Sequence, residues 1–203
     1  MIDDYNALPL GSYMKINEVL TREAEDLDKQ VEIIAILSGK TVDEVLLLPL
    51  TEYSAMAAQT AFLREHCKPS EIREDWRLGD LVPVLDFRKI NTAQYVDFQT
   101  YSKKFPATLP QLLSVMLVPE GKVYNDGYDV LEVQRRVEQM PFPDALGLAA
   151  FFFSRLLKLT EDSLTSWASE MRKKKDEAKR QETMRKIMEL REIFQRVGDG
   201  WLT

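Results

Sequence analysis

Residues 33–50 read IIAILSGKTVDEVLLLPL, and this stretch decides the fold that we expect. From just before this stretch into its first half, apolar residues recur at the i, i+4, i+7 spacing of one helical face. They are Leu27, Val31, Ile34 and Leu37. Gly39 predicts the end of that helix, because glycine readily adopts the left-handed conformation that helix C-termini often need. The stretch therefore predicts short helices separated by sharp stops.

The residues after Gly39 predict two further helices. Thr41 and Glu44 have the spacing of a capping box. In this motif each of the two side chains accepts a hydrogen bond from the backbone N–H of the other residue. Pro49 interrupts this helix, and Thr51 is the expected cap of the next one. Residues 1–68 are thus expected to form one helical unit.

Residues 112–122, LLSVMLVPEGK, resemble a second copy of residues 33–40. In both places a tyrosine-bearing helix precedes the apolar run, and a Gly-Lys pair, a Glu-Val pair and a proline break follow it in the same order. The pattern predicts two similar small helical bundles, each burying the apolar faces of its short helices. The alternative is a chance likeness, since glycine stops and proline breaks occur in any helical protein.

The rest of the chain completes the expected domain organisation. Residues 69–90 are a connector whose LVPVLDF run, with an internal proline, predicts a short extended segment. Residues 91–160 form the second unit, and 161–203 a long charged helix and tail rich in helix formers. The fold class is mostly all-α. A short seam near the C-terminus predicts self-association through Ile187, Leu190, Phe194 and Val197.

Composition excludes several classes of function. The net charge of −6 repels phosphate backbones, so no nucleic-acid partner is expected. The mixed charges of residues 172–186 indicate a solvated helix face rather than a phosphate-binding one. No apolar run of 18 residues is present, so we expect no membrane span, and the acidic N-terminus is unlike a signal peptide.

No catalytic motif is found in the sequence. His66 and Cys67 are the only residues of their types, so a zinc site with several such ligands from one chain is excluded. Neighbouring residues on a helix point about 100° apart, which makes the pair a poor nucleophile and base. We therefore expect a protein that is not an enzyme and binds no cofactor and no metal.

Two segments carry a resemblance to a known family. Residues 8–20, LPLGSYMKINEVL, and 28–63, DKQVEIIAILSGKTVDEVLLLPLTEYSAMAAQTAFL, resemble the tail assembly chaperones of tailed bacteriophages. The shared pattern is a Gly-x-Tyr start, an apolar helix ending in glycine, and a Leu-Pro-Leu break. Residues 90–105 and 117–130 resemble an extended form of these proteins from phages of gut bacteria.

The resemblance implies a function in the host cell cytoplasm. Such a chaperone coats the tape-measure protein, recruits tail-tube protein, and leaves before the tail matures. Grooves lined by leucine, methionine and aromatic side chains suit a helical client, and the expected contacts are Tyr13, Leu50, Tyr53, Met56, Tyr95, Phe98 and Phe142. For each residue the alternative is a place in the core. The alternative function is a structural virion component, a connector or baseplate-associated subunit retained in the particle.

Overall fold

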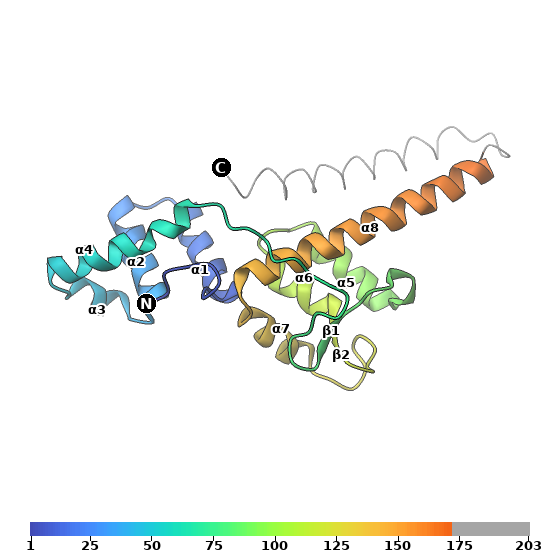
Figure 1. Ribbon diagram of the computed structural model, residues 1–203, viewed down its shortest axis with the longest axis horizontal. Coiled ribbons are helices and arrows are strands. Elements are labelled where there is room, and N and C mark those ends of the chain that lie inside the picture. The colour runs from blue at the N-terminus through green and yellow to red at the C-terminus, as the bar shows by residue number, and fades with distance from the viewer. Residues whose placement is uncertain (172–203) are drawn as a thin grey trace. The chain divides into compact units, whose positions relative to one another are not determined.

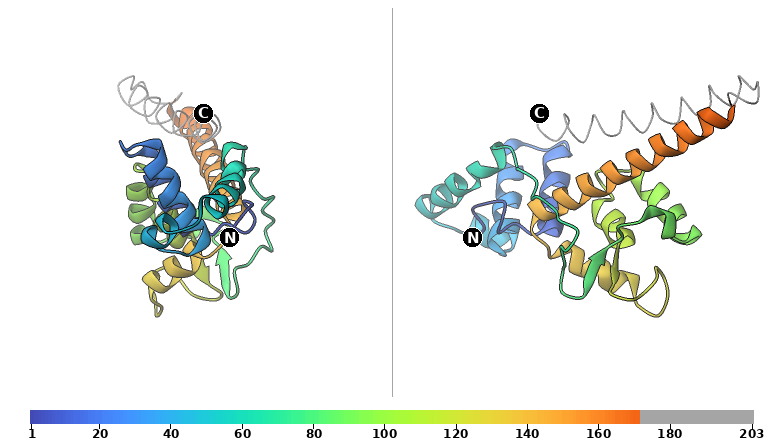
Figure 2. Two further views of the ribbon diagram at one scale, coloured as in Figure 1. Left: turned by 90° about the vertical axis from the view of Figure 1, so that its left-hand side faces the viewer. Right: turned by 45° about the vertical axis from the view of Figure 1, so that its right-hand side comes forward.

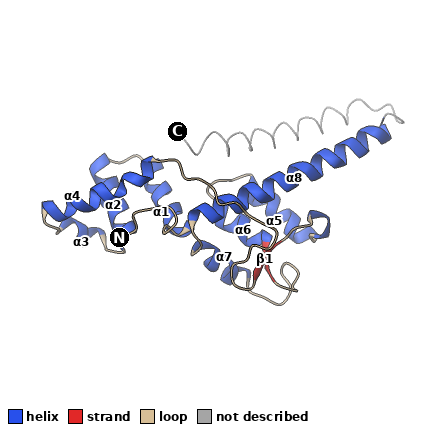
Figure 3. Ribbon diagram, in the orientation of Figure 1, coloured by secondary structure: helices blue, strands red, loops and turns tan. Residues whose placement is uncertain are grey.

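The computed structural model describes residues 1–171 and is mostly helical, as predicted (Figures 1 and 3). Contacts divide the chain into two compact units, Met1–Ala149 and Ala150–Thr203. In the described residues the α-helices are α1 Leu10–Thr21, α2 Asp26–Ser38, α3 Val42–Leu46, α4 Leu50–Gln59, α5 Thr92–Ser102, α6 Leu109–Met116, α7 Val130–Glu138 and α8 Phe142–Met171. Short 3₁₀ turns follow α4, at Thr60–Arg64, and precede α5, at Phe87–Lys89.

Helix α2 is the centre of the first four helices, and α1, α3 and α4 all pack against it (Figure 1). It ends as predicted, because Gly39 takes a φ of 69°. Two faces of α2 are covered. Ile33 and Leu37 join Leu8, Ile16 and Val19 in one cluster of buried residues. Val31 and Ile34 join Ala35 and Val45 in another.

Helix starts agree only in part with the predicted caps. Thr41 caps α3, and the predicted capping box with Glu44 is present. Thr51 is not a cap, because α4 already begins at Leu50 with Pro49 in the cap position and no side-chain bond. Pro49 has a fixed backbone φ that suits the start of a helix, so α4 begins without the side-chain hydrogen bond that was expected from Thr51.

Helix α6 is the centre of the second group of helices, with α5 and α7 packed against it. All its residues except Gln111 are buried. Unlike α2, it is not followed by a glycine, since the chain extends directly into strand β2, Leu117–Pro119. Gly121, with a φ of 78°, lies in the turn beyond that strand.

The extended segment predicted in the connector is strand β1, Leu81–Pro83, and it pairs with β2 in a two-stranded antiparallel sheet (Figures 2 and 3). Val82 faces Val118 in the register. The connector is also fixed to the start of α8, because Ser70 N–H donates to the Pro143 carbonyl at 2.9 Å. An added Cβ on Gly147 would lie 2.2 Å from the Ser70 carbonyl oxygen, so only glycine fits there.

Two proline tripeptides that are distant in sequence pair with each other. Leu10 N–H donates to the Met140 carbonyl and Phe142 N–H donates to the Leu8 carbonyl, each at 2.8 Å. Between these bonds, Pro9 and Pro141 face each other in an antiparallel bridge. The pair joins the start of α1 to the start of α8 within unit 1.

The second unit begins at Ala150, and in its described part α8 continues to Met171. The predicted boundary after residue 160 therefore falls inside a helix, while the boundaries after 68 and 90 stay predictions. Within this unit the Arg155 guanidinium lies over the Phe151 ring, 4.7 Å from its centroid, in a cation–π arrangement.

Candidate protein-binding surface

Helix α3 buries one side chain and exposes the rest. Val45 is buried against Val31, Ile34 and Ala35 of α2. A five-residue helix that packs mainly on one neighbour can bury only the face that it turns toward that neighbour. The residues on its other side are left to solvent.

The turn from α3 to α4 carries an exposed apolar surface that we call the α3–α4 corner, formed by Val42, Leu46, Leu47 and Leu50. Leu46, Leu47 and Leu50 are 64%, 85% and 79% exposed. Single exposed leucines are common on protein surfaces, whereas several together mark a binding site more often. The corner is therefore the best candidate for a surface that contacts another polypeptide.

The corner is held in place by hydrogen bonds at both ends. Thr41 N–H donates to Glu44 Oε2 at 2.7 Å, and Glu44 N–H donates to Thr41 Oγ1 at 3.2 Å. The backbone bond from Thr41 keeps the pKa of the Glu44 carboxyl below its usual value, so this group stays ionised. Beyond the corner, the Tyr53 hydroxyl donates to Gln30 Oε1 at 2.9 Å.

The first four predicted contact residues have different environments. Leu50 is part of the corner itself. Tyr53 and Met56 are half-buried against the α2–α3 core, with one edge left for contact. Tyr13 is stacked on Phe142, with ring centroids 3.5 Å apart and an angle of 15° between the planes.

The second group of predicted contact residues lies mostly in the core. Phe142 and Phe98 are buried, so neither ring reaches the surface of unit 1, and this corrects their expected role as client contacts. Phe98 packs edge-on against Phe87 at 6.0 Å. Tyr95 remains exposed on α5 next to Val96, and is the only one of the three that a partner can touch.

Val42, Leu46 and Leu47 were not among the predicted contact residues. A signal was present, because VLLLPL places more apolar side chains in one turn than a five-residue helix can bury against one neighbour. Periodicity alone did not identify which of them would be exposed, since this depends on which face α2 covers.

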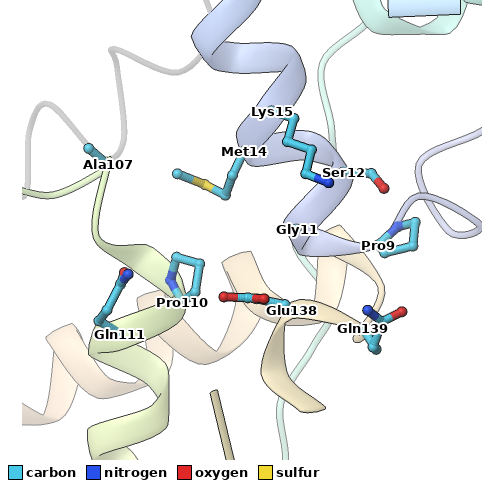
Figure 4. A pocket seen from close by; sticks show the side chains of 10 residues that line it. All are labelled: Pro9, Gly11, Ser12, Met14, Lys15, Ala107, Pro110, Gln111, Glu138 and Gln139. Atoms are coloured by element: carbon cyan, nitrogen blue, oxygen red, sulfur yellow. The ribbon is translucent and has the colours of Figure 1, made fainter. Parts of the chain in front are cut away.

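A hollow of about 300 Å³ lies at the start of α1, between the N-terminal end of α6 and the C-terminal end of α7 (Figure 4). Its walls combine the Met14 side chain with the charged groups of Lys15 and Glu138. Gln134 Nε2 already donates to Glu138 Oε1 at 2.8 Å. Gln111 also lines the hollow, and its buried Oε1 has no hydrogen-bond partner within the described residues.

Groups suited to covalent or metal chemistry have unsuitable environments. Burial raises the pKa of the Cys67 thiol to about 11, so it is protonated at neutral pH and weakly nucleophilic. Within residues 1–171, no three His, Cys, Asp or Glu side chains are placed to hold a metal ion together. In the same residues, no helix is both long and apolar enough to cross a bilayer.

The predicted self-association seam of Ile187, Leu190, Phe194 and Val197 lies outside the described residues.

Comparisons with known proteins give no match of any kind. No protein-family model, no curated protein and no solved structure matches the chain.

Proposed function

We propose that the chain is a tail assembly chaperone of a tailed bacteriophage, a non-enzymatic factor that binds other polypeptides in the host cell cytoplasm. Its clients would be the tape-measure protein and the tail-tube protein. The motifs of residues 8–65 support the family, and the surface chemistry of unit 1 supports protein binding.

The observation that carries the proposal is the α3–α4 corner. Leu46, Leu47 and Leu50 are solvent-exposed on a turn that follows a capped helix. Burying an apolar side chain in an interface contributes about 1.5–3 kcal/mol before the costs of association. An exposed apolar turn is therefore suited to holding a helical client.

We further propose that helices α1–α4 and α5–α8 are divergent copies of one unit. In both sets the second helix packs against the first and third helices, and a proline immediately precedes the fourth helix. A left-handed glycine lies directly after α2 in the first set and beyond strand β2 in the second. Strand β2 is an addition to the second copy, which explains why Gly121 lies further from its helix than Gly39 does. Duplication enlarges a binding surface without adding reactive groups.

Co-expression tests the proposal directly. The chain is produced together with its proposed client, a tape-measure protein, and the soluble fraction of that client is measured. We expect the wild type to keep the client soluble and the variant Leu47→Ser/Leu50→Ser to do so poorly. The matched control is Val96→Ser/Leu131→Ser, which removes two exposed apolar side chains elsewhere in unit 1.

A client that stays insoluble with wild-type protein would contradict the proposal. Mass spectrometry of purified virions then decides between a chaperone and a retained subunit. A chaperone is absent from the particle, whereas a connector or baseplate-associated subunit is present in stoichiometric amount.

A further inference from the structure

The surface around the α3–α4 corner is mostly negative. From Thr41 to Leu63 the chain contains no lysine or arginine, and the cation nearest in sequence, Lys40, helps to lower the pKa of the Glu44 carboxyl. Three carboxylates lie in this segment, on Asp43, Glu44 and Glu52, and all three residues are exposed. The apolar corner is thus flanked by net negative charge.

We propose that this surface binds a basic amphipathic α-helix of a partner polypeptide. The inference rests on the proposed function and specifies the chemistry of the client segment. One face of such a helix supplies aliphatic side chains to the leucines, and the lysines or arginines on its flanks face the carboxylates. Opposite charges at the edge of an apolar contact accelerate association and exclude acidic partners.

A second copy of the chain is a poor occupant of the same surface. In a symmetric dimer each patch contacts its own equivalent. Asp43 and Glu52 of the two copies would then be brought together with like charges, which opposes association. Charge complementarity therefore favours a basic partner over self-pairing.

Designed peptides test the inference on the full chain. Three helical peptides of about 18 residues, or five turns, share one leucine face and carry lysine, glutamine or glutamate on the other. Binding is measured by fluorescence anisotropy of the labelled peptide. We expect the lysine peptide to bind at least about tenfold more tightly than the glutamate peptide, which corresponds to ~1.4 kcal/mol.

Salt dependence and variants locate the site. Raising the salt from roughly 0.01 to 1 M shortens the screening length from about 30 to 3 Å, and should weaken binding of the lysine peptide severalfold. Asp43→Asn/Glu52→Gln should reduce both the affinity and its salt dependence, whereas Glu71→Gln/Asp126→Asn should not. Leu47→Ser/Leu50→Ser should weaken binding about tenfold or more, and Val96→Ser/Leu131→Ser should leave it unchanged.

Four outcomes would overturn the inference. Equal affinity for the lysine and glutamate peptides would remove the role of charge. Equal loss in the corner and control variants would show non-specific attraction to an acidic protein. Sedimentation that shows a wild-type dimer and a monomeric Leu47→Ser/Leu50→Ser variant would assign the surface to a second copy. Failure of every peptide, with the tape-measure protein still solubilised through the corner, would refute the basic helix and leave the proposed function standing.

Discussion

Two apolar runs of similar composition have opposite environments in this molecule. VLLLPL, residues 45–50, exposes three leucines, whereas LLSVML, residues 112–117, is buried throughout. Helix α6 packs against both α5 and α7 and is followed by a strand that pairs with β1, whereas α3 packs mainly against α2. The number of neighbours, and not the hydrophobicity of the run, decides what is buried. Exposure at the α3–α4 corner is thus a property of the fold that needs a functional explanation.

The largest expected difference is between leucines of the two runs. Leu113→Ala removes fully buried methyl groups and should lower the free energy of unfolding by ~2–5 kcal/mol, because the site cannot collapse completely. Leu46→Ala at the corner should change it by no more than ~0.5 kcal/mol. Urea denaturation of both variants measures the contrast, and equal losses would mean that the corner is part of the core.

Gly147→Ala tests how closely the connector packs against the start of α8. The new Cβ would meet the Ser70 carbonyl oxygen, and the required shift should cost ~1–3 kcal/mol. Thermal denaturation gives the loss, and limited proteolysis within residues 69–90 should become faster as the connector separates from α8. A fully stable variant with an unchanged cleavage rate would show that the connector does not contact α8.

Thr41→Ala tests what holds the exposed region. Removing the hydroxyl breaks the capping box at α3 and should cost ~0.5–2 kcal/mol. Thr51→Ala is the matched control, since Thr51 does not cap α4 and its loss should be close to neutral. If both variants lose the same stability, the bonds of Thr41 are not what fixes the corner.

The smallest effect is on the titration of Glu44. Its carboxylate accepts hydrogen bonds from Thr41, so the folded pKa lies below the usual value of 4.5. The bonds stabilise the fold above the unfolded pKa, and this contribution disappears as the pH falls through the lower folded pKa. Carboxyl NMR should show the depressed pKa in wild type and a smaller depression in Thr41→Ala, which loses the hydroxyl bond and keeps the backbone N–H bond. An identical pKa in both proteins would exclude the hydroxyl bond as a contributor.

Local features of the fold were predictable from the sequence, and contacts between distant residues were not. The helical character, the Gly39 stop, the Thr41–Glu44 box and the extended segment near Leu81 all follow from rules that act over a few residues. Strand β2 was not predicted, because Leu117 and Val118 continue the apolar run of α6 and only the pairing with β1 makes them extended.

The candidate site was predictable to a lesser degree. Leu50 was identified with its exposure unknown, and Phe98 and Phe142 were chosen for aromatic character that in fact serves the core. Aromatic residues are favoured in both interiors and interfaces, so residue type cannot separate the two. The environment of Phe142 depends on Tyr13, more than a hundred residues away, through a stacking contact that no local pattern encodes.

The bridge between Pro9 and Pro141 has a consequence for biosynthesis. At a translation speed of about 5–20 residues per second, roughly 7–26 s pass between the synthesis of these two residues. Throughout that interval the backbone groups of Leu8 and Leu10 lack the partners that Met140 and Phe142 supply. The first helix therefore completes its hydrogen bonds only after the start of α8 has been synthesised, although the ribosome releases it first.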